Sequence, residues 1–215
     1  MSKIFAAWNN NRLTLVLFIA AIIGLPVLAA LNTPPQTPIP SSPTPHPLHS
    51  GVTLPPNYRA DYIHYATVQR PDGTIRDIYI NPEGLKVAQQ YIFPEQTTIV
   101  IEGYYAARDD NGKFRLDENG HYIRGEYFEA VHVRQKRFDW LPGDFVSEAR
   151  NGYWNYGSFE TKTGQPFDES ITACFNCHHA SEQQDFLFTY PQLLRYTVSG
   201  EPQFFICNLT GRSAC

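Results

Sequence analysis

Hydrophobic and polar positions in the first half of the chain predict a β-hairpin. Residues 62–69 (YIHYATVQ) and 74–80 (TIRDIYI) are rich in β-branched and aromatic side chains, which favour strands. Between them, Pro71-Asp72-Gly73 is typical of a tight turn. Three further strands are predicted at 97–105 (TTIVIEGYY), 127–134 (YFEAVHVR) and 152–161 (GYWNYGSFET).

The rest of the pattern predicts only short helices. Asn81, Pro82 and Glu83 supply an N-cap, a first-turn proline and an acidic side chain for the helix dipole, so a helix is predicted from there to about Tyr91. From about Phe167 the chain reads as irregular or helical. The predicted fold class is therefore α+β and β-dominated, with a mostly antiparallel sheet and a few short helices.

The N-terminal segment, residues 1–32, contains an uncharged apolar stretch at 13–31. A membrane-spanning helix needs about 20 such residues. Two interpretations stay open: a transmembrane anchor, or a signal peptide cleaved near Ala29. Lys3 and Arg12 precede the stretch, so the positive-inside rule keeps the N-terminus in the cytoplasm. The rest of the chain is then expected in the periplasm, either anchored to the membrane or released.

A proline-rich linker, residues 33–53, follows the apolar segment. Its composition favours an extended polyproline II conformation, because proline fixes φ and lacks a backbone donor. We expect it to act as a semi-rigid stalk. The folded domain is predicted at 54–200, with a C-terminal tail at 201–215.

Composition narrows the classes of function. The net charge of −4 at pH 7 argues against a nucleic-acid partner. Four cysteines are too few for a disulfide scaffold of 215 residues. Cys207 and Cys215 either form a disulfide across a short loop or leave Cys215 as a thiol in the tail. The one methionine is Met1, so the predicted domain contains none.

Cys174, Cys177 and His178 form a C-x-x-C-H motif, which is typical of c-type haem attachment. Two thiols one helical turn apart can each add to a haem vinyl group, and the next residue then presents its imidazole to the iron. We therefore predict one covalent haem c per chain, held by a C-terminal attachment segment with His178 as the metal ligand. Three alternatives stay open: a thioredoxin-like redox pair, a Cys174–Cys177 disulfide, and a zinc site. The zinc site would use the two cysteines of the motif, His178 or His179, and Cys207.

The second axial position of such a haem is restricted by composition. Electron-carrying cytochromes c commonly use a methionine there, and this domain has none. What remains is an open position or a second histidine, for which the sequence offers His64, His121 and His132.

Glu102 and His132 are the candidate catalytic residues of the distal side. Glu102 lies in an apolar strand, where an unpaired carboxylate is costly. His132 shares one face of its strand with Arg134 and Lys136. For both candidates the alternative is a side chain on a solvated face of the sheet.

Six stretches of the chain, in this order, resemble the cytochrome P460 family, which includes the cytochromes c′-β. They are 54–59 (LPPNYR), 70–82 (RPDGTIRDIYINP), 93–95 (FPE), 151–159 (NGYWNYGSF), 173–178 (ACFNCH) and 185–189 (DFLFT). The resemblance spans about residues 54–195 and is more specific than the haem motif alone.

The resemblance implies a β-sheet domain that holds haem c, with Cys174 and Cys177 as thioether anchors and His178 as the proximal ligand. Members of the family oxidise hydroxylamine or bind nitric oxide at an open distal face. The hydroxylamine-oxidising members carry a lysine cross-linked to the haem, and residues 97–108 contain no lysine here.

The predicted function is an exported mono-haem cytochrome that oxidises or binds small nitrogen species. A non-catalytic gas-binding or sensor protein and a bis-histidine electron-transfer cytochrome are the alternatives. The expected partners are hydroxylamine or nitric oxide, a redox partner protein, the membrane through the N-terminal helix, and a second copy of the chain in a homodimer.

Overall fold

The computed structural model describes residues 50–90, 92–141, 144 and 150–207. The predicted anchor or signal peptide, nearly all of the linker and the end of the tail lie outside the described residues. Within the described ranges, no helix is long and apolar enough to cross a bilayer.

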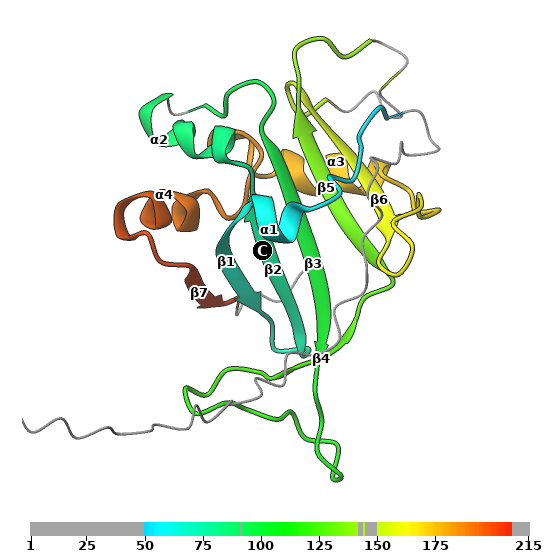
Figure 1. Ribbon diagram of the computed structural model, residues 1–215, viewed down its shortest axis with the longest axis vertical. Helices are drawn as coiled ribbons and strands as arrows, with labels where there is room; N and C mark the ends of the chain where they lie inside the picture. The colour runs from blue at the N-terminus through cyan, green and yellow to red at the C-terminus, as the bar shows by residue number, and fades with distance from the viewer. Residues whose placement is uncertain (1–49, 91, 142–143, 145–149, 208–215) are drawn as a thin grey trace, which may run out of the picture. The chain divides into compact units, whose positions relative to one another are not determined.

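Seven strands form one sheet in the order β6-β5-β3-β2-β1-β7, with β4 paired to β3 (Figure 1). The strands β1 and β7 run parallel, and the other strand pairs of the sheet are antiparallel. The strands are β1 (Ile63–Gln69), β2 (Thr74–Ile80), β3 (Thr98–Ala106), β4 (Arg124–Tyr127), β5 (Ala130–Lys136), β6 (Trp154–Glu160) and β7 (Gln203–Ile206).

The helices are short. They are α1 (Tyr58–Asp61), η1 (Pro82–Lys86), α2 (Val87–Gln90), α3 (Thr172–His179), η3 (Glu182–Gln184) and α4 (Tyr190–Ser199), where η marks a 3₁₀ helix. The predicted fold class, a β-dominated and mostly antiparallel sheet with a few short helices, is confirmed.

Local chemistry explains several of these elements. The predicted hairpin forms between β1 and β2, with Gly73 at a φ of +85° in its turn. The predicted helix after Asn81 begins as 3₁₀ and continues as α2. The side chain of Asn81 accepts a hydrogen bond from the Gly84 amide at 3.3 Å and caps the first turn. The strand β7 lies in the segment that the sequence analysis assigned to a tail, and it pairs in the sheet with β1.

The sheet has two faces with different contents. Ile78, Ile101, His132 and Ser158 lie opposite one another across four strands and define what we call the first face. Because successive side chains of a strand point to opposite sides, their sequence neighbours lie on the second face. Glu102 is one of these neighbours.

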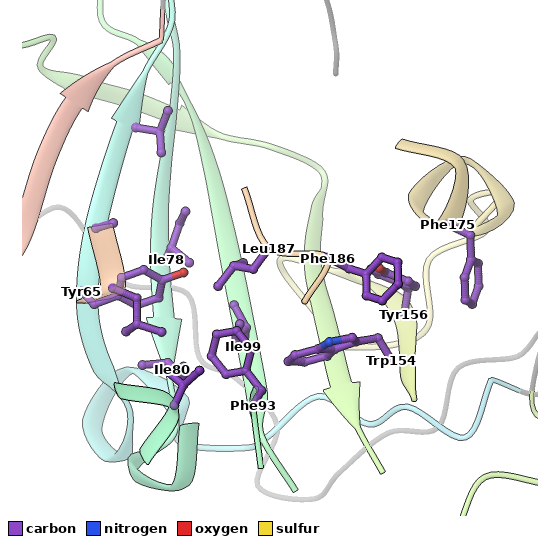
Figure 2. Close-up of a cluster of buried hydrophobic side chains, with 14 of the residues drawn as sticks. Tyr65, Ile78, Ile80, Phe93, Ile99, Trp154, Tyr156, Phe175, Phe186 and Leu187 are labelled. Atoms are coloured by element: carbon purple, nitrogen blue, oxygen red, sulfur yellow. The ribbon is translucent and has the colours of Figure 1, made fainter. Parts of the chain in front are cut away.

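The main hydrophobic core covers the first face. Figure 2 shows Ile78, Ile80 and Ile99 of the sheet with residues from later parts of the chain. These later residues include Trp154 and Tyr156 of β6, Phe175 of α3, and Phe186 and Leu187, which follow η3. A smaller core, which includes Val100, Val133 and Phe159, lies on the second face.

Candidate functional site

The helix α3 carries the C-x-x-C-H motif and is fixed by a buried aromatic residue between the two cysteines. Phe175 is fully buried and packs edge-on against Tyr156, with ring centroids 4.8 Å apart. The side-chain amide of Asn151 donates a hydrogen bond to the Phe175 carbonyl at 3.0 Å. Cys174 and Cys177, one helical turn apart, are both present as thiols. The alternative of a disulfide between them is not realised in this structure.

His178 is held by its Nδ1 atom. This atom lies 2.9 Å from the Phe186 carbonyl oxygen and 3.2 Å from Nη1 of Arg134. The imidazole stacks on the Tyr156 ring at a centroid distance of 5.3 Å. Within the part of the chain that the structure describes, no hydrogen bond involves Nε2 of His178. The orientation therefore leaves Nε2 available to an electrophile.

The surroundings keep His178 and Cys174 uncharged. Burial, and then the positive charge of Arg134, lower the pKa of His178 from 6.5 to about 3. Burial, and then the negative charge of Glu169, raise the pKa of Cys174 from 9.0 to about 12. At neutral pH His178 is thus a neutral imidazole, which is the form that binds metal ions.

Arg134 on β5 is a buried cation next to His178. Its guanidinium is 3.9 Å from the centre of the Trp154 ring, and Nη1 donates a hydrogen bond to the Phe186 carbonyl at 2.6 Å. The side chain is 1% exposed, and its Nε and Nη2 atoms have no hydrogen-bond partner among the described residues.

The loop that supplies the Phe186 carbonyl has an unusual backbone. Asp185 and Phe186 have positive φ angles of 49° and 61°, which cost free energy in residues with a side chain. The carboxylate of Asp185 offsets this cost by binding three other groups. It accepts hydrogen bonds from Lys136 Nζ at 2.5 Å, from the Phe93 amide at 2.9 Å and from the Trp154 indole at 3.2 Å.

His132, a candidate catalytic residue, lies on the same face of the sheet as Arg134. Its Nε2 atom is 2.9 Å from a carboxylate oxygen of Glu169, which also accepts a hydrogen bond from Ser158 at 2.6 Å. Arg134, two residues along the same strand face, contacts His178. The structure therefore places His132 on the side of the sheet that carries the motif.

Glu102, the other candidate, lies on the second face, where it is fully buried. Its carboxylate accepts hydrogen bonds from Tyr58, Arg59 and Tyr104. Burial, together with the Glu102 charge, raises the pKa of Tyr58 and of Tyr104. The structure does not bring Glu102 together with His178.

The other two candidate axial histidines also lie away from His178. His64 contacts Asp77 at 3.5 Å on the second face, and its ring packs against Tyr79. His121 follows an exposed turn and stacks on Phe204 of β7. Of the three histidines, His132 alone shares the first face with Arg134.

Comparison with known families agrees with this geometry. The family model of cytochrome P460 matches residues 55–189. The chain belongs to the cytochrome P460 family. No curated protein matches the sequence. Membership of the cytochrome P460 family implies a haem cofactor, so the residues around α3 can be tested for their fit to haem.

The residues present fit what a cytochrome P460 haem requires. They offer two thiols one turn apart, a neutral imidazole with an available Nε2 atom, and an aromatic lining from Tyr156 and Phe188. The zinc alternative has no comparable ligand set, because the described residues contain no group of three or more His, Cys, Asp and Glu able to hold a metal ion. Cys207 is buried and disulfide-bonded, and Cys215 lies outside the described residues.

The described residues also line a cavity of about 620 Å³ where β4 ends, β5 begins and β6 ends. Its lining includes Phe128 and Phe167 and none of the motif residues. The Phe128 ring covers Gly103 on the first face, where a Cβ atom would lie 2.0 Å from it. The cavity therefore borders the first face of the sheet.

Three residues of this cytochrome P460 site were not identified as functional from the sequence: Glu169, Asp185 and Phe186. Asp185 and Phe186 lie in one of the stretches that resemble the family, which was the available signal. Arg134 was placed correctly on the face of His132, and its burial was not predicted. The partner of His132 could not be found from strand alternation, because Glu169 lies in an irregular segment before α3.

Proposed function

We propose that this protein is an exported mono-haem c-type cytochrome with an open distal iron position that oxidises or binds small nitrogen species. The observation that carries the proposal is the state of α3: two thiols and a neutral imidazole whose Nε2 atom makes no hydrogen bond within the described residues. Hydroxylamine and nitric oxide are the small molecules proposed.

Each residue of the motif has a role in this proposal. Cys174 and Cys177 would hold the haem through thioether bonds, and Nε2 of His178 would bind its iron. The Nδ1 proton of His178 is directed to the Phe186 carbonyl, which fixes the tautomer and the orientation of the ring. The bound haem supplies a redox-active iron with a position for a small ligand.

His132 and Glu169 form a pair that can accept a proton on the first face. Each electron that an external acceptor removes from hydroxylamine is accompanied by a proton from its nitrogen or oxygen. Because Nε2 of His132 donates its hydrogen bond to the Glu169 carboxylate, Nδ1 of His132 is the ring nitrogen that could receive such a proton. The electrons would leave to a redox partner protein.

The residues around His178 favour an open position over bis-histidine coordination. The chain has no methionine after Met1. His64 and His121 lie elsewhere, and Nε2 of His132 is engaged by Glu169. A passive gas-binding protein remains the alternative to an enzyme, since residues 97–108 contain no lysine for a cross-link.

Export and membrane attachment belong to the same proposal. The apolar stretch at 13–31 after Lys3 and Arg12 supports translocation of the domain to the periplasm, with or without later cleavage. The mass of the mature polypeptide distinguishes a retained anchor from a cleaved signal peptide, and fractionation shows whether the protein stays with the membrane.

The decisive experiment is the mass of the denatured full chain after expression with a haem c maturation system. The expected mass is that of the polypeptide plus one haem, and the C174A/C177A variant should lose the haem. A polypeptide mass without haem would refute the proposal.

Ligand binding and turnover then separate the alternatives. Carbon monoxide should change the spectrum of the ferrous protein, and an unperturbed low-spin spectrum would instead show a closed iron. Hydroxylamine-dependent reduction of an acceptor dye should be slower in H132Q than in the control H121Q, whose site is a turn remote from His178. Absence of turnover in the wild type would favour the passive protein.

A further inference from the structure

A buried positive charge lies next to Nδ1 of His178, the ring nitrogen on the other side of the imidazole from Nε2. Arg134 is 1% exposed, and its Nη1 atom is 3.2 Å from Nδ1 of His178. Its planar guanidinium lies against Trp154, whose ring Figure 2 shows next to Tyr156 and Phe186. The charge is therefore fixed in place and removed from water.

This charge is not neutralised by a carboxylate. Arg134 forms no ion pair within the described part of the chain. The carboxylate whose charge acts on Arg134 is that of Asp185, which already pairs with the buried Lys136. The positive charge of Arg76 on β2 also lowers the pKa of His178. The balance of charged groups behind the imidazole is thus positive.

The hydrogen bonds of Arg134 act in the same direction as its charge. The Phe186 carbonyl accepts from both Arg134 Nη1 and His178 Nδ1, at 2.6 and 2.9 Å. A carbonyl shared with a cation is a weaker acceptor for the imidazole proton. The imidazole then gains less anionic character, and a less anionic axial ligand donates less electron density to a metal.

We propose that Arg134 is a positioning residue with two effects. It holds the loop of Asp185 and Phe186 against His178, and it raises the reduction potential of the iron that His178 binds. The inference rests on the proposed function, in which a haem iron is bound at Nε2 of His178. A fixed positive charge disfavours the more positive ferric state relative to the ferrous state. Burial weakens the screening of that charge by solvent and salt.

Two variants separate the charge of Arg134 from its hydrogen bonds. R134Q removes the charge and keeps an amide donor, whereas R134K keeps the charge without the planar guanidinium, whose Nη1 atom contacts both Phe186 and His178. D185N removes the negative charge from the same cluster and should shift the potential in the opposite direction. R137Q is the matched control, because Arg137 is a half-exposed arginine that pairs with Asp139.

The readout is the midpoint potential of the full-length holoprotein, measured by spectroelectrochemistry, together with the iron–histidine stretching frequency. In R134Q the reduced-to-oxidised ratio at a fixed potential should fall about tenfold, which for a one-electron couple corresponds to about 59 mV. R134K should retain most of the potential and change the stretching frequency. D185N should raise the potential, and R137Q should leave it unchanged.

The outcomes distinguish this inference from the proposed function. A wild-type protein without haem would overturn both. If the wild-type protein carries haem and the reduced-to-oxidised ratio of R134Q at a fixed potential stays within threefold of the wild-type ratio, the inference alone is overturned. If R134Q does not fold, R134K and D185N decide it: a raised potential in D185N with an altered stretching frequency in R134K supports the inference, and two wild-type results overturn it.

Discussion

Replacing Glu102 by glutamine should destabilise the domain strongly without changing the haem site. The carboxylate is fully buried on the second face and accepts hydrogen bonds from Tyr58, Arg59 and Tyr104. Glutamine has the same shape and no charge, and its NH2 group would face groups that themselves donate. One donor would lose its acceptor, and the Arg59 guanidinium would lose the carboxylate that it contacts.

The magnitude follows from the burial of this pair. Removing one partner of a buried ion pair costs about 3–5 kcal/mol. Arg59 is 16% exposed, so the lower end of that range, about 3 kcal/mol, is appropriate. For a domain of about 150 residues, each kcal/mol shifts Tm by roughly 2–4 °C. The expected loss is therefore roughly 6–12 °C.

The assay compares E102Q with E126Q by thermal unfolding followed by circular dichroism. Glu126 lies on the exposed strand β4, so its substitution should change the stability by no more than about 0.5 kcal/mol. The visible spectrum of E102Q at low temperature should equal that of the wild type, because Glu102 and His178 lie on opposite sides of the sheet. A Tm within 2 °C of the wild type, or an altered iron spectrum, would refute the reasoning.

Three further outcomes follow from other buried residues. Burial alone would raise the pKa of Asp77, but hydrogen bonds from His64, Arg124 and Thr67 lower it from 3.8 to about 2. Asp77 therefore adds about 2 kcal/mol of stability above pH 4, and this contribution is lost as the pH falls toward 2. D77N should therefore unfold with a flatter pH dependence between pH 4 and 2, and parallel curves would contradict the assignment. G103A should cost about 1–3 kcal/mol in urea unfolding, because its Cβ would overlap the Phe128 ring, and the loss should be smaller in a F128A background. F175A should lower the free energy of unfolding by about 3–5 kcal/mol by the same method. A smaller loss than that of F128A would show that the Phe175 ring does not anchor α3.

The part of the fold that depends on local pattern could be predicted from the sequence. The β1–β2 hairpin follows from its turn residues and β-branched side chains, and β3 follows from its run of β-branched and aromatic residues. The strand β7 could not be found in this way. It has four residues, Gln203–Ile206, and exists through a parallel pairing with β1 that no nearby residue specifies.

The candidate site shows the same division between local and long-range information. The C-x-x-C-H spacing located Cys174, Cys177 and His178 without any structure. Strand alternation placed His132 on one face with Arg134 and Lys136. The opposite orientation of Glu102 follows only from the pairing of Ile101 with His132, which the sequence does not specify. The burial of Arg134 likewise depends on packing by a segment 52 residues later in the chain, at Phe186.

The parallel pairing of β1 with β7 has a consequence for the order of folding. The two paired segments, 66–69 of β1 and 203–206 of the edge strand β7, lie on either side of both β6 and α3 in the sequence. Contacts between such distant segments form late, because closing a long loop costs entropy before any pairing is gained. When the chain emerges with its N-terminus first, the two thiols of α3 are exposed before the strand β7 has formed. Attachment chemistry at those thiols can thus precede completion of the sheet at its β7 edge.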